Sequence, residues 1–595
     1  MYRLYRNTFL VALVVVISGC PETGHQDRQE TSISTDKQSG EHRNPVPAIP
    51  SAGDTDEIRE LTANDSIAKQ TGARQEMTVL SSPVPLFSPA EGLISGRNMQ
   101  DIRLPAEPLN RENYAHYDDN PVKRVIEFPV STFSIDVDTG SYANVRRFLK
   151  SGNLPAQDAV RAEELINYFS YDYSPPRDTG TPFSLVREIA PTPWNPDTYL
   201  LHIGIQGYEI APEKLPAANL VFLVDISGSM QAPDKLGLLK SSLKLLTRHL
   251  DADDRVSLVV YAGGTGVVLE PTAGDQNARI ITALDQLVAG GRTNGAAGIN
   301  LAYAMAEQGF IKGAINRVLL ATDGDFNVGT TGIEQLKDLI EEKRKGGISL
   351  STLGFGTGNY NDQLMEQIAD TGNGNYAYID TLGEAQKVLV DEMTSTLMTI
   401  AKDVKIQIEF NPAVVEEYRL VGYENRQLKR EDFNNDKIDA GDIGAGHSVT
   451  ALYEIAMKDS KGRRIDPLRY QAGENTRKPV TSHEIAFLRL RYKQPYSDNS
   501  QLLEWAIQQQ EVINEPGKTS DAFRFSAAVA AFAQQLRGGA YTGQFDYDAT
   551  LALAGSARAE DPFGYRGEFL TLVNLAKSLS VKKPVPVPVA EMQRR

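Results

Sequence analysis

The sequence predicts a doubly wound α/β domain that is inserted into a β-sandwich and flanked by helices at both ends. Residues 219–399 alternate short apolar runs with amphipathic segments, the pattern of buried parallel strands connected by helices. The segments on both sides of this region alternate single apolar and polar residues, which is typical of half-buried antiparallel strands. Beyond those segments, apolar residues recur with helical spacing.

The central region has the element order of a Rossmann-like α/β domain. Gly346 and Gly347 follow a helical pattern, where a terminating glycine is expected. The strands are expected at 219–224, 256–261, 316–321, 348–355 and 376–379. The helices are expected at 234–250, 276–288, 297–308, 331–345, 361–370 and 383–399.

The flanking strands are expected to belong to one sandwich. Two of them, 183–189 and 198–206, precede the α/β region, and two strands alone are too few for a stable sheet. The others are expected at 404–410, 415–423, 447–456 and 483–492. Since domains with neighbouring termini tolerate insertion, residues 183–210 and 401–495 are predicted to form a single sandwich around the α/β domain.

Helices are expected outside this sandwich on both sides, and the nested order suggests that they pack together. They are predicted at 139–150, 159–169, 501–513, 522–536 and 566–579. The predicted division of the chain is 1–19 (signal peptide), 20–110 (disordered tether), 111–218 (accessory region with helices, then strands), 219–399 (α/β domain), 400–496 (β-rich domain), 497–580 (helical region) and 581–595 (flexible tail).

The amino terminus has the pattern of an export signal. Arg3 and Arg6 precede a short apolar stretch that ends in Ile17-Ser18-Gly19-Cys20. Small residues before a cysteine resemble the bacterial lipobox, which implies cleavage before Cys20 and its lipidation. Multiple acyl chains anchor a protein stably. The expected location is therefore the cell membrane or outer membrane, facing the periplasm or exterior; the alternative is an ordinary cleaved signal.

Residues 21–110 are rich in Pro, Ser, Thr and charged residues and contain few aromatic residues, a composition that cannot bury enough surface to fold. A coil of this length has a root-mean-square end-to-end distance of roughly 50 Å.

The net charge of −16 argues against a nucleic-acid partner, which would require a basic face.

Five oxygen-bearing residues form the candidate functional site. Both carboxylates directly follow apolar runs that are predicted as strands, and open α/β sheets bind ligands beyond the carboxyl ends of their strands. Hard oxygen ligands suit Mg²⁺ or Mn²⁺. The five residues are Asp225, Ser227, Ser229, Thr293 and Asp323. The alternative is that Asp225 and Ser227 only cap a helix.

The pattern Asp-x-Ser-x-Ser, with the later Thr293 and Thr-Asp-Gly, resembles the metal-ion-dependent adhesion site of von Willebrand factor type A domains. The resemblance implies that the two serines ligate the metal directly, that the threonine binds directly or through water, and that the aspartates act mostly through water. It also implies an open position for a carboxylate of a partner protein.

The runs NPVKRVIEFPVSTFSIDVDTGSYANVRRFL, GFGTGNYNDQLMEQIADTGNGNYAYID and GHSVTALYEI are similar to a group of bacterial lipoproteins, the YfbK-like proteins. The likeness covers roughly residues 111–580. In that group a type A domain lies between two accessory regions, to which no function is assigned.

Three hypotheses for function follow. The first is a binding module, in which the metal captures an Asp or Glu of a partner protein. The second is a metal-assisted hydrolase, for which Asp325 is the nearby candidate base. The third is an envelope scaffold whose metal is only structural. We favour the first and expect no enzymatic activity.

Two further motifs have ordinary explanations. The glycine-rich run 354–358 follows a strand and precedes a helix, but its third glycine has the wrong offset for dinucleotide binding. In Asp136-Val137-Asp138, a helix cap at Asp138 or Thr139 is expected, and a second ion site is the alternative.

Overall fold

The computed structural model describes residues 112–177, 180–211, 214–291, 293, 295–324, 326, 332–466 and 483–580. The predicted signal peptide, tether and tail, together with Cys20, lie outside these residues. Within the described part of the chain, no helix has the length and apolar character needed to cross a membrane.

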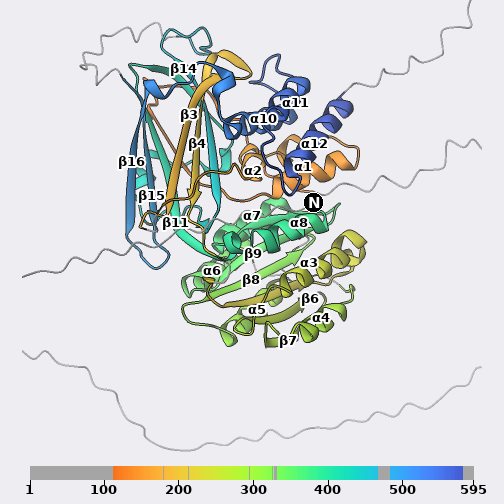
Figure 1. Cartoon of the computed structure of the whole chain (residues 1–595). Helices are drawn as coiled ribbons and strands as arrows, with labels where there is room; N and C mark the ends of the chain where they lie inside the picture. The colour runs from red at the N-terminus through yellow and green to blue at the C-terminus, as the bar shows by residue number, and fades with distance from the viewer. Residues whose placement is uncertain are drawn as a thin grey trace, which may run out of the picture. The chain divides into compact units, whose positions relative to one another are not determined.

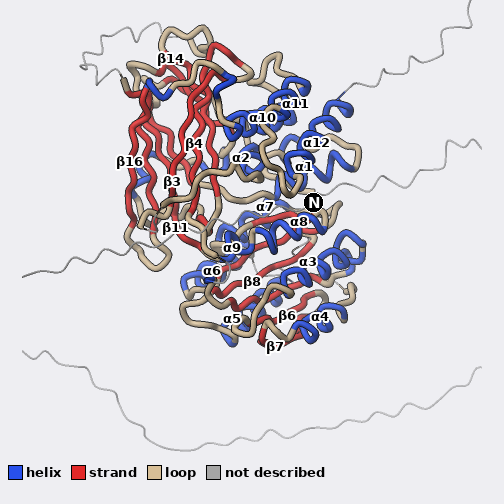
Figure 2. Tube along the Cα trace, in the orientation of Figure 1, coloured by secondary structure: helices blue, strands red, loops and turns tan. Residues whose placement is uncertain are grey.

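The α/β domain contains a six-stranded sheet with the strand order β10-β9-β8-β5-β6-β7. Figure 2 shows the strands of this domain in red among its helices in blue. Its strands are β5 (Ala218–Asp225), β6 (Arg255–Tyr261), β7 (Thr265–Ala273), β8 (Ile315–Thr322), β9 (Ser349–Phe355) and β10 (Tyr376–Ile379). The five predicted strands are confirmed and are parallel, whereas β7 was not predicted and pairs antiparallel with β6. Strand β7 is partly exposed at the sheet edge and contains Pro271, so it lacks a continuous apolar run.

Helices cover both faces of this sheet. Apolar residues of α3, α4 and α8 form one core with the strands, and those of α5, α6 and α7 form the other. The bounds are α3 (Leu238–Thr247), α4 (Asn277–Asp285), α5 (Gly295–Gln308), α6 (Ile333–Lys345), α7 (Asp362–Thr371), α8 (Leu382–Gln386) and α9 (Met393–Leu397). The predicted doubly wound architecture is confirmed.

Two of the predicted helices are interrupted. The segment 234–250 begins with a separate turn, Pro233–Gly237, in which Lys235 departs from helical dihedral angles before α3 begins. The segment 383–399 is divided into α8, a turn over Lys387–Asp391 and α9. It ends early because Thr399 already belongs to strand β11.

Two antiparallel sheets form the β-sandwich. The first has the order β1-β12-β14-β4-β3, and the second has the order β13-β11-β15-β16, with β2 also paired to β11. The strands are β1 (Lys123–Arg124), β2 (Val130–Ser134), β3 (Phe183–Thr192), β4 (Asn195–Gly207), β11 (Thr399–Phe410), β12 (Val415–Val421), β13 (Ile443–Gly444), β14 (Ser448–Met457), β15 (Glu484–Lys493) and β16 (Ser500–Gln508).

The predicted insertion of the α/β domain into this sandwich is confirmed. Strand β4, before the α/β domain, pairs with β14, after it, over eight residue pairs that include Ile203 with Ala451. One apolar core joins both sheets, with Leu201 from the first and Ile406 from the second.

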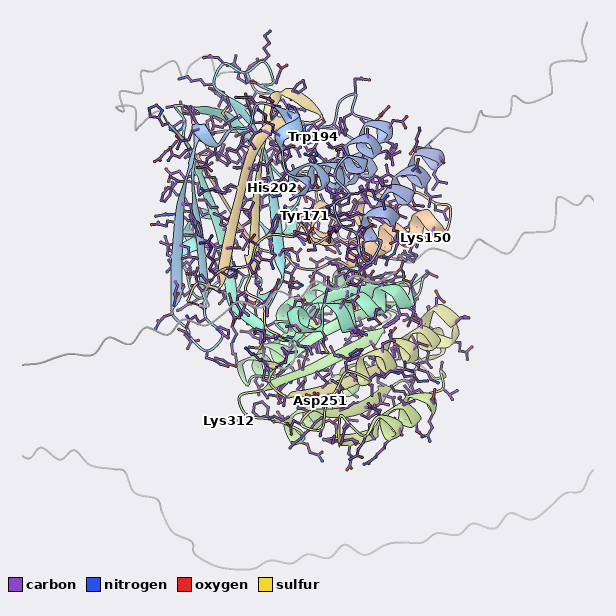
Figure 3. The ribbon with its side chains drawn as sticks, in the orientation of Figure 1. Lys150, Tyr171, Trp194, His202, Asp251 and Lys312 are labelled. Atoms are coloured by element: carbon purple, nitrogen blue, oxygen red, sulfur yellow. The ribbon has the colours of Figure 1, made fainter. Side chains whose placement is uncertain are left out.

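A helical layer covers the outer face of the first sheet (Figure 1). Leu200 and Leu452 of that sheet share a core with helices from both ends of the chain, so the predicted packing of the terminal helices is confirmed. Figure 3 labels Tyr171 and His202 where the strands meet these helices. The helices are α1 (Gly140–Lys150), α2 (Ala162–Asn167), α10 (Asp521–Leu536), α11 (Tyr547–Gly555) and α12 (Tyr565–Ser580).

The predicted helix at 501–513 is wrong. Residues Ser500–Gln508 form β16, which pairs antiparallel with β15 from Lys493 to Glu484. The edge of β15 needs a hydrogen-bonding partner, and this tertiary requirement overrides the local helical propensity. The start of the segment that was predicted as helical, 497–580, therefore belongs to the sandwich. Strands β1, β2 and β13 were also missed.

Candidate metal centre

The candidate centre lies where the strand order of the α/β sheet reverses. From β5 the chain first adds β6 on one side and then returns to add β8 on the other. Loops diverge at the carboxyl ends of β5 and β8, and this is where open α/β sheets bind ligands. Strand β5 ends at Asp225, and β8 ends one residue before Asp323.

The carboxylate of Asp225 is buried and held in one orientation. Its Oδ1 accepts a hydrogen bond from the backbone N–H of Ser227 at 2.8 Å, and its Oδ2 accepts one from the hydroxyl of Thr322 at 2.9 Å. Burial raises the pKa of Asp225 to about 6, and the nearby charge of Asp323 adds to the rise, while the two hydrogen bonds oppose it. The position is costly for an anion unless a cation is close.

The two serines lie together in the loop after β5. Ser227 Oγ and Ser229 Oγ are 2.9 Å apart, and Ser227 is buried. Ser227 precedes the short turn Gly228–Gln231, but its side chain makes no capping hydrogen bond. Ser227 therefore does not act as a side-chain cap, whereas Asp225, the other residue of the capping alternative, does accept the backbone N–H of Ser227.

The loop that carries Thr293 is fixed against the serine loop. The backbone N–H of Gly290 donates to the carbonyl of Ile226 at 2.7 Å, and that of Gly228 donates to the carbonyl of Gly291 at 3.0 Å. Thr293 itself is half-buried, two residues before α5 begins.

Asp323 is fully buried and has a cationic neighbour. The ammonium of Lys235 donates to Asp323 Oδ2 at 2.8 Å and to Asn359 Oδ1 at 3.2 Å. The next residue, Gly324, has φ +85, and a Cβ there would lie 2.5 Å from the backbone N of Asn361. Only glycine fits the backbone directly after Asp323.

The structure therefore brings Asp225, Ser227 and Ser229 into one loop and places Asp323 close enough to act on the charge of Asp225. Their roles as metal ligands, like that of Thr293, stay predictions. Sequence reasoning missed Thr322 and Lys235. Thr322 stands beside Asp323 in the motif itself, whereas a lysine within an amphipathic segment gives no local signal.

The donor set fits a hard divalent cation. It consists of hydroxyl and carboxylate oxygens, and the partners of Asp225 are a backbone N–H and a hydroxyl. Such oxygens are the ligands that Mg²⁺ and Mn²⁺ prefer. Asp325, the candidate base of a hydrolase, lies outside the described residues.

A second group of acids is buried between the accessory helices and the α/β domain. One oxygen from each of Asp136, Glu164 and Glu366 lies within 4.8 Å of the others. Arg426 Nε is 3.1 Å from Asp136 Oδ2, and its Nη2 is 3.1 Å from Glu366 Oε1. Arg161 pairs with Glu164. We call these five residues the arginine-bridged cluster, since its two guanidinium groups contact all three acids.

A helix cap was predicted at Asp138 or Thr139, and only the position of the cap, at Thr139, is confirmed. Helix α1 has Thr139 at its N-cap position without a side-chain capping bond. Asp138 instead accepts a hydrogen bond from the backbone N–H of Tyr376 at 2.8 Å, and Asp136 accepts one from the N–H of Asp138 at 3.0 Å. The motif attaches the accessory region to strand β10.

Comparison with known proteins is consistent with this architecture. Residues 219–392 match the von Willebrand factor type A domain family, residues 395–579 match the family described as "Uncharacterized protein YfbK, C-terminal", and residues 108–202 match a family described as von Willebrand factor. The chain is 50% identical to "Uncharacterized protein YfbK" of Escherichia coli (strain K12) over 473 residues, which are 78% of this chain and 81% of that protein. The chain belongs to the YfbK family.

More distant relatives share only part of this YfbK family chain. It is 26% identical to inter-alpha-trypsin inhibitor heavy chain H3 of Homo sapiens over 283 residues, 43% of this chain but 31% of that protein. A solved structure of a von Willebrand factor type A protein from Catenulispora acidiphila has 16% identity and a TM-score of 0.38, and covers 69% of this chain and 91% of that one.

Von Willebrand factor type A domains are protein-interaction domains, and they often bind a divalent metal.

Proposed function

We propose that this protein is a metal-dependent binding module, anchored in the cell envelope, that captures an acidic side chain of a partner protein. Asp225, Ser227, Ser229, Thr293 and Asp323 would hold Mg²⁺ or Mn²⁺. When bound, the ion supplies a coordination position that a carboxylate oxygen of the partner can fill. Affinity for the partner then requires both the metal and one Asp or Glu.

The observation that supports this proposal most strongly is the arrangement of the loop after β5. Two hydroxyl oxygens lie 2.9 Å apart beside a carboxylate whose orientation is fixed from both of its oxygens. Fixing the carboxylate in advance reduces the cost of ordering it when a cation binds.

A capture experiment from crosslinked membranes tests the proposal. The full chain is used as bait in Mg²⁺ and in chelator, together with Asp225→Asn and Ser227→Ala. We expect Mg²⁺-dependent capture of a partner by the wild type and its loss in both variants. Ser241→Ala is the matched control, because this serine lies on α3 and donates only to the carbonyl of Gly237. Capture that is unchanged in chelator and in both variants would contradict the mechanism.

The melting temperature of the same protein distinguishes a metal that serves recognition from one that is purely structural. If the metal serves recognition alone, the melting temperature in chelator stays close to that in Mg²⁺ apart from the shift due to ligand binding. A collapse of thermal stability in chelator would favour a structural role.

The proposed location depends on Cys20, which follows the apolar stretch of the signal. Cells that are fed labelled palmitate should incorporate the label into the wild-type chain and not into Cys20→Ala. The variant should also leave the membrane fraction. A labelled Cys20→Ala chain, or an unlabelled wild type, would contradict the lipid anchor.

A further inference from the structure

A buried ammonium group stands at the candidate metal centre. Lys235 is 6% exposed, and its Nζ donates to Asp323 Oδ2 at 2.8 Å. Lysine is rarely buried to this degree unless it is paired. The residue belongs to neither the ligand pattern nor the core, so its placement calls for its own explanation.

The absence of a side chain at Gly356 leaves the space that the stem of Lys235 occupies. Gly356, in the loop after β9, has φ +71, and a Cβ at that position would lie 2.3 Å from Cγ of Lys235 and 2.4 Å from its Cε. At the tip, Asn359 Oδ1 accepts a second hydrogen bond from the ammonium at 3.2 Å. The glycine-rich loop, which was considered above for dinucleotide binding, thus accommodates the lysine stem and holds its charge beside Asp323.

We propose that Lys235 is an internal counter-cation that competes with the divalent metal for Asp323 and thereby sets the metal affinity of the centre. This inference rests on the proposed function. In the absence of metal, the ammonium neutralises a carboxylate whose burial would otherwise be costly. A metal that binds near Asp323 must do so against the repulsion of this fixed positive charge.

The charge of Lys235 also affects how strongly the centre favours an acidic partner. The two carboxylates of Asp225 and Asp323 with the ammonium of Lys235 carry a net charge of −1. A divalent ion changes this to +1, whereas without the lysine it would only reach neutrality. The surplus positive charge favours an additional carboxylate, so the lysine weakens metal binding and strengthens the demand for an acidic partner.

Calorimetric titration of the purified full chain with MgCl₂ and MnCl₂ tests the inference. Lys235→Met removes the charge and keeps the apolar stem, and we expect it to bind Mg²⁺ at least about tenfold more tightly than the wild type, which corresponds to about 1.4 kcal/mol. Lys240→Met is the matched control on α3, where the ammonium donates to the carbonyls of Asp285 and Leu287 away from the centre. It should leave the metal affinity unchanged.

Lys235→Gln covers the case in which the methionine variant does not fold, since the amide retains a donor without the charge. Equal or weaker Mg²⁺ binding by the folded Lys235 variant overturns the inference and leaves the proposed function intact. Binding by the variant but not by the wild type would show that Lys235 opposes the metal, but it would contradict the proposed function, because the natural centre would then hold no metal, and the inference that Lys235 tunes that centre would fail with it. If neither chain binds either metal, the proposed function itself fails, and the inference fails with it.

Discussion

The candidate metal centre and the arginine-bridged cluster both bury carboxylates, but the groups that contact these carboxylates differ. At the cluster, Arg426 and Arg161 contact the carboxylates directly, and the charges are satisfied within the chain. At the metal centre, Asp225 is held by a backbone N–H and a hydroxyl, neither of which carries charge. The first arrangement fastens parts of the protein together, whereas the second leaves negative charge for a cation from solution.

The two sites differ because their residues lie in different parts of the fold. Arg426 lies in the sandwich, Glu164 in α2 and Glu366 in α7, so the cluster connects three parts of the chain. The predicted ligands of the candidate metal centre lie at the carboxyl end of β5 and in loops at the same edge of one sheet. A network that spans several elements stabilises their assembly, and a set of loops at a sheet edge can respond to a ligand.

The largest effect is expected from breaking the cluster. Arg426→Met should destabilise the protein by about 3–5 kcal/mol, because it leaves buried carboxylates without their counter-charge. The melting temperature, measured by circular dichroism, should fall strongly and equally with and without Mg²⁺. Arg489→Met is the control, since its pair with Glu504 is exposed and its loss should cost less than about 1 kcal/mol. Equal melting temperatures of the two variants would contradict the comparison.

The pH dependence of stability should also originate at the cluster. Burial raises the pKa of Glu164 from 4.5 to about 8 and that of Glu366 to about 7. The folded chain therefore retains protons that the unfolded chain releases above pH 4.5. This contribution to stability is fully present below pH 4.5 and is lost as the pH rises to about 8.

The melting temperature of Glu164→Gln should consequently fall less steeply than that of the wild type between pH 5 and pH 8. Glu504→Gln is the control, because its side chain is 41% exposed and should leave the slope unchanged. Parallel profiles for the wild type and Glu164→Gln would show that Glu164 is ionised in the folded protein throughout this range.

A smaller effect on stability, but a clear one on metal binding, is expected at Thr322. Thr322→Val removes the hydroxyl that donates to Asp225 Oδ2 at 2.9 Å. The unsatisfied carboxylate oxygen should cost about 1–2 kcal/mol of stability, and loss of this orienting contact should weaken Mg²⁺ binding about tenfold or more. Titration calorimetry measures the affinity. Thr272→Val, on the distant strand β7, is the control for loss of a buried hydroxyl.

The sequence predicted that the two aspartates of the candidate metal centre lie at one sheet edge, because the signal for their placement is local. Asp225 and Asp323 each follow an apolar run, and the carboxyl ends of neighbouring parallel strands lie at the same sheet edge. Lys235 and the cluster could not be predicted in this way, since their partners are distant in sequence: Lys235 pairs with a residue 88 positions away, and Arg426 with one 290 positions away.

The misassigned strand β16 has a related cause. Its residues Leu502, Leu503 and Trp505 are compatible with a helical face, and the choice of strand depends on the open edge of β15. That edge exists only once the sandwich has assembled. Local periodicity therefore defined the buried strands of the α/β domain well but not this edge strand of the sandwich.

The smallest effect on stability is expected at Thr293, which is half-buried in the loop beside the serines. Thr293→Ala should change the free energy of unfolding by no more than about 0.5 kcal/mol, yet it should weaken Mg²⁺ binding, because it removes one of the oxygen donors. Thr293→Ser keeps the hydroxyl and should retain the wild-type affinity. If the alanine and serine variants bind Mg²⁺ equally, the centre consists only of residues from the loops after β5 and β8. Ser229, whose side chain is also half-buried, would then be the next residue at which a substitution should weaken Mg²⁺ binding with little effect on stability.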